Sequence, residues 1–599
     1  MYLHVAKRKN GLYMTILKKY RDDNGCPKDI VVQTPGYVSK YTDLYDDPVA
    51  HFKTVAKEMT VKCKEEESHT LTLDTKDEMP NNTDDAKNVG YGVLKCLYKE
   101  LELDKFWKKE TKGMKIKYSA DKIFQMLVYS RILFPASKKK SWEKKGQFFE
   151  DFGAFSMDDV YSALDIFGRK EKKLQAWIYD HSVTKYHRDL SVGYFDCTNY
   201  YYDISKPDTD DIDEDGNVLL ERYRKYGPEK NHRKDPIVEM GLLMDKTGIP
   251  LAYDLFPGNQ SEKKHMLPII NRARTDYGFG RIIVVADRGL NTSDNIYFLN
   301  GKNDSDNNPR DGYVYGQSVR GADAEFKEWV LKNDEYIRTR INDTNTDDDD
   351  IDDKAIFIHK SRIYPKKIQI TREKSNGKTV KQSITVDQKQ MAYYSNKYAV
   401  KQKLERNRAI ERAMDLINHP KKYDKVSAKG ASGYVMNLSY DKETGAVIDK
   451  NLILDAEKIK EEEQYDGYYS IVTSELKMTD IEIRDTYRGL IRIEDTFKVT
   501  KSEFDTRPIF VRTNDHIDAH FTVCFTAIVL IRLLQLRLKG NASVGKILHS
   551  LRKYNCVPVK NLYQFCYRDE IINACSESFN MELGTKYRSR KAVRSILNY

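Results

Sequence analysis

At 599 residues the chain is too long for one hydrophobic core, so several domains are expected. Apolar residues make up 40% of it and charged residues 32%, with a mean hydropathy of -0.69, which indicates a folded, soluble chain and argues against disorder. The net charge of +10 favours an anionic partner.

The eight cysteines show neither a CxxC pair nor a regular spacing, so neither a zinc knuckle nor a disulfide framework is expected. They predict reduced, mostly buried thiols in a cytoplasmic protein. The N-terminal sequence lacks the apolar run of a secretion signal. The longest apolar segment, residues 521–531, is shorter than the roughly 20 residues that cross a bilayer, so it predicts a core helix.

The N-terminal third alternates between ordered and polar segments. Residues 1–61 combine short apolar runs with a turn at Lys9-Asn10-Gly11, which predicts a small unit with a β-hairpin. Residues 62–89 read as a polar linker, and residues 90–189 as a helical DNA-binding or dimer region. The basic groups Lys138–Lys140 and Lys144–Lys145 in that region either contact phosphates or are solvated.

Residues 190–320 alternate strands with helices. The expected order is three strands, a helix, a strand, a helix and a strand, at residues 191–195, 237–244, 251–256, 262–277, 282–286, 293–299 and 312–319. This is the order of a ribonuclease H-like α/β core with a mixed sheet. The first and fourth strands lie side by side in such a core, so Asp196 and Asp287, which follow them, are expected to meet. The alternative for each aspartate is a turn or cap residue.

A β-rich insertion domain is expected over residues 321–475. It contains the acidic run Asp347–Asp353, interpreted as a solvated loop, and then residues 354–429, with 20 Lys or Arg against six Asp or Glu. Such a stretch is expected to bind phosphates by counterion release.

The second part of the core, residues 476–545, contains a predicted helix over Asp480–Lys501. At 100° per residue, its polar arc of about 60° holds Tyr487, Glu494, Lys498 and Lys501, in a row about 21 Å long. This row suits a polyanion near a metal, although a solvated amphipathic helix is the alternative. A basic helical tail, residues 546–599, is interpreted as a DNA or dimer contact or as a solvated helix.

Three acids carry the predicted chemistry. Asp196, Asp287 and Glu494 are expected to hold two Mg²⁺ ions, for which Mn²⁺ can substitute, about 3.5 to 4 Å apart. Such a pair activates the attacking oxygen and neutralises the leaving 3′ oxygen of a phosphodiester. No histidine or cysteine cluster competes for the role, because His232 and His265 are isolated and are interpreted as structural residues or phosphate contacts.

The segments around the three acids resemble a known family. YFDCTNYYYDI around Asp196, EMGLLMDKTGIPLAYDLFPGNQSEKKHMLPII, VVADRGLNTSDNIYFL around Asp287 and YRGLIRIEDTFKVTKSEFDTRPIFV around Glu494 resemble the DDE transposases of bacterial insertion sequences. The resemblance covers about residues 190–540. It implies that the three acids are the catalytic triad and the metal ligands.

The most similar subgroup carries a Tyr-x2-Arg-x3-Glu-x6-Lys signature. Tyr487 and Lys501 match its first and last members, but Leu490 stands where the arginine is expected. Arg492 points about 140° away from Tyr487, whereas Arg484 lies one turn earlier on roughly the same side. This departure leaves open whether the DNA ends are resolved through hairpins.

The resemblance implies a cut-and-paste transposase that binds terminal inverted repeats and a target duplex, as a homodimer in the synaptic complex. It places the protein at the bacterial nucleoid, with no membrane partner. The DNA contacts that it implies are Tyr487, Lys501, Arg288, Lys498, Arg484 and Arg507. Two alternatives stay open: a related metal-dependent nuclease, and a domesticated sequence-specific DNA-binding protein.

Overall fold

The computed structural model describes residues 1–21, 27–65, 76, 78, 81, 84–228, 235–299, 311–340, 356–373, 379–419, 430–436, 452–540 and 542–597. The chain forms two compact units, Met1–Thr83 and Asp84–Tyr599. The acidic run Asp347–Asp353 and His232 lie outside the described residues.

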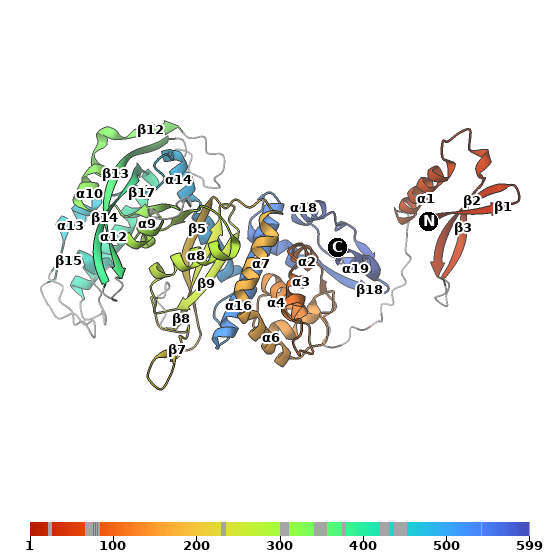
Figure 1. Ribbon diagram of the computed structural model, residues 1–599, viewed down its shortest axis with the longest axis horizontal. Helices are drawn as coiled ribbons and strands as arrows, with labels where there is room; N and C mark the ends of the chain where they lie inside the picture. Colours follow the sequence, from red (N-terminus) through yellow and green to blue (C-terminus); the bar gives the residue numbers. More distant parts are fainter. Residues whose placement is uncertain are drawn as a thin grey trace. The chain divides into compact units, whose positions relative to one another are not determined.

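The first unit is a three-stranded antiparallel sheet with one helix. Its strands are β1 (Tyr2–Arg8), β2 (Gly11–Arg21) and β3 (Pro27–Tyr37), in that order. The predicted hairpin at Lys9-Asn10-Gly11 is confirmed by the β1–β2 pairing. Helix α1 (Pro48–Glu65) lies beside the sheet in Figure 1 and continues into the segment predicted as a linker.

A helical region opens the second unit. Its helices are α2 (Tyr91–Glu100), α3 (Leu103–Glu110), α4 (Ala120–Leu133), α5 (Lys138–Glu143), α6 (Met157–Arg169) and α7 (Glu171–Val183). Helix α16 (Asn514–Arg537) packs against α2, α4, α6 and α7, so segments far apart in sequence share one core (Figure 1). Among the described helices, α16 alone is long and apolar enough to span a membrane, yet 89% of its apolar window is buried inside the protein. It is the core helix that its sequence predicts.

Lys138, which begins α5, does not contact phosphate as its sequence position suggested. Its side chain is buried, and its Nζ lies 2.7 Å from Nδ1 of His520 on α16. Burial lowers the pKa of Lys138 to about 7. The described cysteines behave as predicted, since all are free thiols and all but Cys566 are buried.

The central sheet has nine strands in the order β12-β13-β14-β17-β11-β10-β5-β8-β9. Five of them are the strands expected between residues 190 and 320: β5 (Val192–Tyr201), β8 (Ile237–Asp245), β9 (Pro250–Pro257), β10 (Ile283–Ala286) and β11 (Gly312–Gln317). Strand β10 runs parallel to both β5 and β11, which confirms that the first and fourth of these strands are neighbours. Helices α8 (Met266–Tyr277) and α9 (Ser293–Leu299) pack on one face, and α16 packs on the other.

Strand β5 is longer than predicted. The sequence suggested an end at Asp196, but β5 pairs with β8 from Gly193 to Tyr201. Its second half contains Thr198, Tyr200 and Tyr201, residue types that favour extended structure. Asp196 therefore lies within a strand and not at its end.

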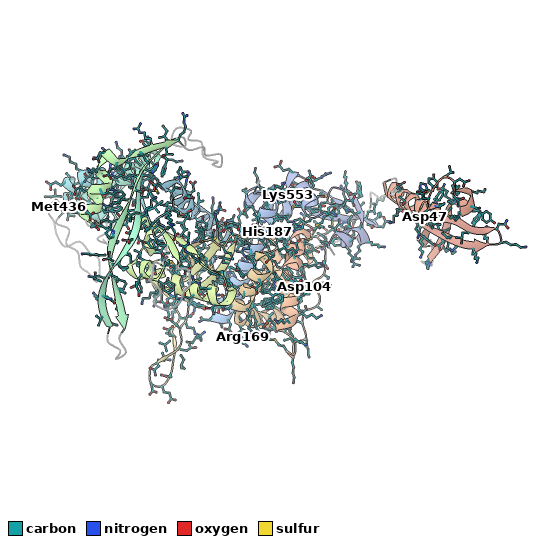
Figure 2. The ribbon with its side chains drawn as sticks, turned by 45° about the horizontal axis from the view of Figure 1, so that its top comes forward. Asp47, Asp104, Arg169, His187, Met436 and Lys553 are labelled. Atoms are coloured by element: carbon teal, nitrogen blue, oxygen red, sulfur yellow. The ribbon has the colours of Figure 1, made fainter. Side chains whose placement is uncertain are left out.

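Most described strands of the segment predicted as an insertion domain join the central sheet, and two short ones, β15 (Val435–Met436) and β16 (Ile453–Leu454), pair in a sheet of their own. Strands β12 (Ile337–Arg340), β13 (Ile356–Glu373), β14 (Thr379–Tyr394) and β17 (Tyr468–Thr473) extend the central sheet, because β17 pairs with both β14 and β11. Strands β13 and β14 form a long ribbon, and Met436 of β15 lies to the left of it in Figure 2.

The C-terminal tail is not purely helical. Strands β18 (Asn555–Val559), β19 (Leu562–Phe565) and β20 (Tyr587–Ser589) join β4 (Lys87–Asn88) in a four-stranded sheet. Helices α17 (Val544–Lys553), α18 (Glu570–Ser578) and α19 (Arg590–Leu597) accompany it. The side chain of Asn88 donates to the Leu551 carbonyl at 2.8 Å, so the end of the predicted linker is fixed to the tail.

A buried ion pair joins the helical region to the sheet. Arg188 and Asp245 are both fully buried, with Nε 2.6 Å from the carboxylate, and the guanidinium also donates to the carbonyls of Ile249 and Pro250. Replacing Arg188 by Met leaves the Asp245 charge buried without its partner, so we expect a loss of about 3–5 kcal/mol in unfolding free energy. Urea unfolding followed by tryptophan fluorescence measures it, because all four tryptophans lie in the second unit.

The matched control is Arg169→Met, which breaks a pair with Asp515 whose side chains are 68% and 46% exposed. Exposed pairs contribute about 0–1 kcal/mol, so the urea midpoint should barely move. Equal shifts in the two variants would contradict the role given to Arg188.

Candidate active site

Two predicted acids lie in or directly after neighbouring strands: Asp196 is inside β5, and Asp287 follows the last residue of β10. Strand β10 runs parallel to β5 with Val285 opposite Tyr194, and the same register continued by two residues sets Asp287 opposite Asp196. Side chains two residues apart on a strand share a face. Asp196 and Asp287 therefore belong to the face on which Tyr194 and Val285 join the core that contains α16.

The third acid, Glu494, lies on a helix that is less regular than predicted. The segment 480–501 forms α14 (Asp480–Arg488), a tight turn at Gly489 and Leu490, and α15 (Ile491–Lys498). It then widens into a π-helical turn over Val499–Glu503. Backbone hydrogen bonds between residues three apart, such as the one from the Arg492 N–H to the Gly489 carbonyl, tighten the junction between α14 and α15.

The tight turn fits the sheet below it. A Cβ atom at Gly489 would lie 1.9 Å from the hydroxyl oxygen of Tyr194, so only glycine allows this approach. At the other end, Lys501 Nζ donates to Thr198 Oγ1 at 2.5 Å, and the hydroxyls of Thr500 and Tyr200 are 3.0 Å apart. The helix is thus attached to β5 at two places.

These two attachments bracket the acids. Asp196 lies between Tyr194 and Thr198 on the same face of β5, and Glu494 lies between Gly489 and Lys501 on the helix. The four steps from Tyr194 to Thr198 along the strand span about 13 Å and the twelve steps from Gly489 to Lys501 along the helical segment about 18 Å, so the two segments have comparable lengths. The Glu494 helix therefore crosses β5 in the region of Asp196.

Tyr487 connects the helix to the second aspartate. Its hydroxyl lies 3.4 Å from Asp287 Oδ1 and 3.3 Å from the hydroxyl of Tyr469 on β17. Burial raises the pKa of Tyr487 well above its usual value, and Tyr469 and Asp287 act in the same direction. The phenol stays protonated and donates, while the Arg288 backbone N–H donates to the same carboxylate oxygen at 2.6 Å.

The start of α14 is anchored to the extension of the sheet. Asp480 accepts from His359 Nδ1 of β13 at 2.7 Å and from Lys389 Nζ of β14 at 2.8 Å. Burial alone would raise the pKa of Asp480, but these hydrogen bonds outweigh it and lower the pKa to about 2. The strands of the predicted insertion thus hold the beginning of the helix that carries Glu494.

A pocket of about 480 Å³ opens beside Asp287. Its lining combines cationic and aromatic side chains from the core and the inserted segment: Arg288, Arg320, Tyr398, Arg406, Tyr434 and Tyr469. Asp196, Asp287 and Glu494 are not in the lining, but the pocket adjoins the candidate site through Arg288, which follows Asp287, and through Tyr469, which contacts Tyr487.

The other predicted site residues differ in their exposure and in their contacts. Glu494 and Lys498 are exposed, and Arg507 lies 5.7 Å from the Tyr201 ring. Arg484 is only 7% exposed and lies over Phe357, so it has a packing role in place of the predicted DNA contact. His265 stacks on Phe256 with ring centroids 3.7 Å apart, in the structural role expected for it.

Sequence reasoning missed Tyr194, Thr198 and Tyr469 as site residues. The period-2 alternation of β5 places Tyr194, Asp196 and Thr198 on one face, so the first two omissions were detectable. Tyr469 carries no such signal, because its contact with Tyr487 depends on which strand neighbours β11.

Oxygen ligands are what Mg²⁺ prefers, and the level aspartates supply them. Within the described parts of the chain, no three His, Cys, Asp or Glu side chains gather closely enough to hold a metal ion. Asp196 and Asp287 supply the oxygen ligands that a hard divalent cation prefers, and a metal site completed by Glu494 stays a prediction.

No family model and no curated protein matches the sequence. Among solved structures, the chain is similar to a piggyBac transposase in a synaptic complex with hairpin DNA, at 8% identity and a TM-score of 0.31, over 85% of this chain and 82% of that one. It is also similar to the Mos1 transposase in a paired-end complex with the left transposon end, at 11% identity and a TM-score of 0.12. That match covers 41% of this chain and 65% of the Mos1 chain.

The contact of Gly489 with Tyr194 is testable. Gly489→Ala forces the helix and β5 apart, and overpacking of this kind costs about 1–3 kcal/mol, so the urea midpoint should fall. Adding Tyr194→Leu makes room for the new methyl group and should recover part of the loss.

Gly289→Ala is the matched control, because a Cβ at Gly289 meets nothing within 4 Å. It should change the unfolding free energy by no more than about 0.5 kcal/mol. The contact is refuted if Gly489→Ala is as stable as this control, or if Tyr194→Leu fails to improve it.

Proposed function

We propose that the protein is a metal-dependent DNA transposase with a ribonuclease H-like catalytic core. The observation that supports the proposal is the parallel pairing of β5 with β10, whose register continued by two residues brings Asp287 level with Asp196, together with the attachment of the Glu494 helix to β5. In the order β9-β8-β5-β10-β11, β5 and β10 are neighbours, as the sequence predicted for the first and fourth strands of such a core.

Asp196, Asp287 and Glu494 are the proposed ligands, with Glu494 completing the set when DNA and metal are bound. A pair of Mg²⁺ ions at these carboxylates would increase the nucleophilicity of the attacking oxygen and neutralise the charge of the leaving oxygen. Mn²⁺ prefers the same ligands and is proposed to substitute.

The surrounding residues position these carboxylates. Tyr487 and the Arg288 N–H donate to the same oxygen of Asp287, which fixes the rotation of its carboxylate and leaves the second oxygen for a ligand. The attachment of Lys501 to Thr198 holds the Glu494 helix against β5 next to Asp196. Exposed Lys498 and Arg288 supply positive charge for the DNA backbone.

The proposed reaction has two steps. A water oxygen attacks a phosphorus atom at the end of the element, and the P–O bond to the 3′ oxygen breaks, which leaves a 3′ hydroxyl. That hydroxyl then attacks a phosphorus atom of the target duplex in line, so one P–O bond forms as another breaks. Each step consumes and releases one oxygen nucleophile without an oxidant or reductant.

The residue at position 490, a leucine, bears on whether the cleaved DNA ends pass through a hairpin intermediate. It is 8% exposed and belongs to the core shared with α16, so this position offers no cation to DNA. Cleavage and joining require only the acids, and a hairpin intermediate is therefore left out of the proposal.

Alanine at Asp196, Asp287 or Glu494 should abolish Mg²⁺-dependent cleavage of DNA that carries the flanks of the gene, by at least about 10³-fold, while binding to that DNA persists. Asp495→Ala is the matched control, since Asp495 is the next residue on α15 and pairs at the surface with Arg532. It should cleave normally.

The reaction products distinguish the alternatives. Joining of the 3′ hydroxyl to a second duplex identifies a transposase, whereas cleavage without joining identifies a nuclease. Binding of the flanks without cleavage in Mg²⁺ or Mn²⁺ identifies a DNA-binding protein, and cleavage that survives in any alanine variant removes that acid from the catalytic set.

A further inference from the structure

Strand β3 forms one edge of the sheet in the first unit. Among the described strands of this unit the order is β1-β2-β3, so β3 has a neighbour on one side, β2 (Figure 1). Met14 and Ile16 of β2 are fully buried, and helix α1 packs against β1 at the opposite edge. The covered part of the unit therefore lies over β1 and β2, and β3 extends beyond it.

The exposed stretch of β3 is apolar at its centre. All eight residues from Pro27 to Thr34 are exposed. Ile30, Val31 and Val32 are 53%, 58% and 38% exposed, and successive residues of a strand point to opposite faces, so this edge is apolar on both faces. An exposed edge strand with β-branched apolar residues favours pairing with another strand through its backbone groups.

Two prolines limit the segment that another strand can pair with. Proline has no backbone N–H, so Pro27 and Pro35 cannot donate a hydrogen bond to an added strand. The seven residues between them, Lys28–Thr34, have Val31 at their centre. Pro35 is buried, and its carbonyl accepts a hydrogen bond from the Tyr41 hydroxyl at 3.1 Å, which fixes this end of the segment.

We propose that β3 pairs antiparallel with β3 of a second copy of the chain, about a twofold axis at Val31, so that the two sheets form one of six strands. Copies related by a twofold axis present the same surface to each other. Val31 then faces the partner's Val31, and Ile30 faces the partner's Val32. Pro27 faces the partner's Pro35, so the prolines lie just outside both ends of the paired segment.

The charged residues of the segment agree with this register. Lys28 faces the partner's Thr34 and Asp29 faces the partner's Gln33, so no like charges are opposed. An axis at Ile30 would instead set the lysine and the aspartate against apolar side chains. The three apolar residues meet their own copies only when the axis passes through the central valine.

Duplex DNA fits this edge less well than a second copy does. Met1–Thr83 contains 13 Lys or Arg and 13 Asp or Glu, and Lys28–Thr34 contains one lysine and one aspartate. A surface without excess positive charge gains little from the release of counterions by DNA. A second copy supplies the matching apolar residues and the backbone groups of a strand, so it is the occupant that this edge suits.

The pairing requires neither DNA nor a metal ion, so it differs from the synaptic homodimer that the family resemblance implies. Seven residues from each copy make a small interface, of the size class that associates weakly and reversibly. The proportion of dimer should therefore rise with the protein concentration.

Sedimentation equilibrium of the full chain, without DNA and in EDTA, measures this association. The wild-type chain of 69.8 kDa should form a dimer. Val31→Glu and Val31→Lys each set like charges against each other at the axis, and each should raise the dimer dissociation constant by at least about tenfold. Mixed in equal amounts, the two variants set opposite charges against each other and should associate within about threefold of the wild-type affinity.

The matched control is Leu12→Glu, which makes the same change of charge at an apolar residue of β2 that is 46% exposed. Leu12 lies five residues before Leu17, which is the residue that pairs with Val31, so it is outside the proposed contact. This variant should change the dissociation constant by less than about threefold.

Disulfide formation tests the register. Val31→Cys sets two thiols against each other at the axis, where opposite Cα atoms are about 4.5–5.5 Å apart and within reach of a disulfide. Mild oxidation should give a covalent dimer on a non-reducing gel with Val31→Cys. The wild-type chain should give none, and neither should Thr34→Cys, because Thr34 faces the partner's Lys28.

Circular dichroism checks that the charged variants stay folded, and Val31→Cys keeps the test decisive if they do not, because it keeps a small apolar side chain. The proposal is overturned by a wild-type chain that stays monomeric at every concentration, or by a dimer that Val31→Glu leaves intact. Equal losses with Leu12→Glu, a mixture that associates no better than the separate variants, or equal cross-linking through Thr34→Cys would also overturn it.

Discussion

The attachment of one helix to one strand determines the candidate site. Gly489 lies against Tyr194 so closely that a methyl group would collide with the phenol, and Lys501 reaches Thr198 four residues further along β5. The three acids span 298 positions of the sequence (494 − 196), and the strand register continued past β10 brings two of them level. The third depends on this attachment, so its strength sets how firmly Glu494 is held near Asp196.

The sheet extension supports the same helix from its other end. Asp480 begins α14 and is bonded to His359 and Lys389 on the two strands of the long ribbon. Because β14 pairs with β17 and β17 pairs with β11, this support is continuous with the strands that carry the aspartates. A change in the ribbon would therefore reach the start of the Glu494 helix through hydrogen bonds and not through a flexible linker.

The sequence predicted that the first and fourth strands of the core, β5 and β10, are neighbours, because strand order and hydrophobic runs are local signals that limit the possible topologies. It did not predict that Asp196 lies inside its strand, since the end of β5 is set by its long pairing with β8. It also missed the break in the helix at Gly489, which follows from contact with a residue almost 300 positions earlier. Likewise, the inserted strands looked like a separate domain because cross-strand pairing leaves no mark in a single sequence.

A count of charged residues is a weak guide to where an anionic partner would bind, because it ignores ion pairing and burial. The basic stretch 354–429 suggested a phosphate-binding surface, yet Lys360 is buried beneath aromatic rings and Arg406 is buried against Asp466 and Glu463. Lys389 is likewise used inside the protein, because it forms an ion pair with the largely buried carboxylate of Asp480. The first unit shows the opposite case, since Arg8 and Lys19 are held by aromatic rings at the surface and keep their charge accessible. A cation that packs on an exposed ring remains available to an anionic partner, whereas one that compensates a buried carboxylate is already used.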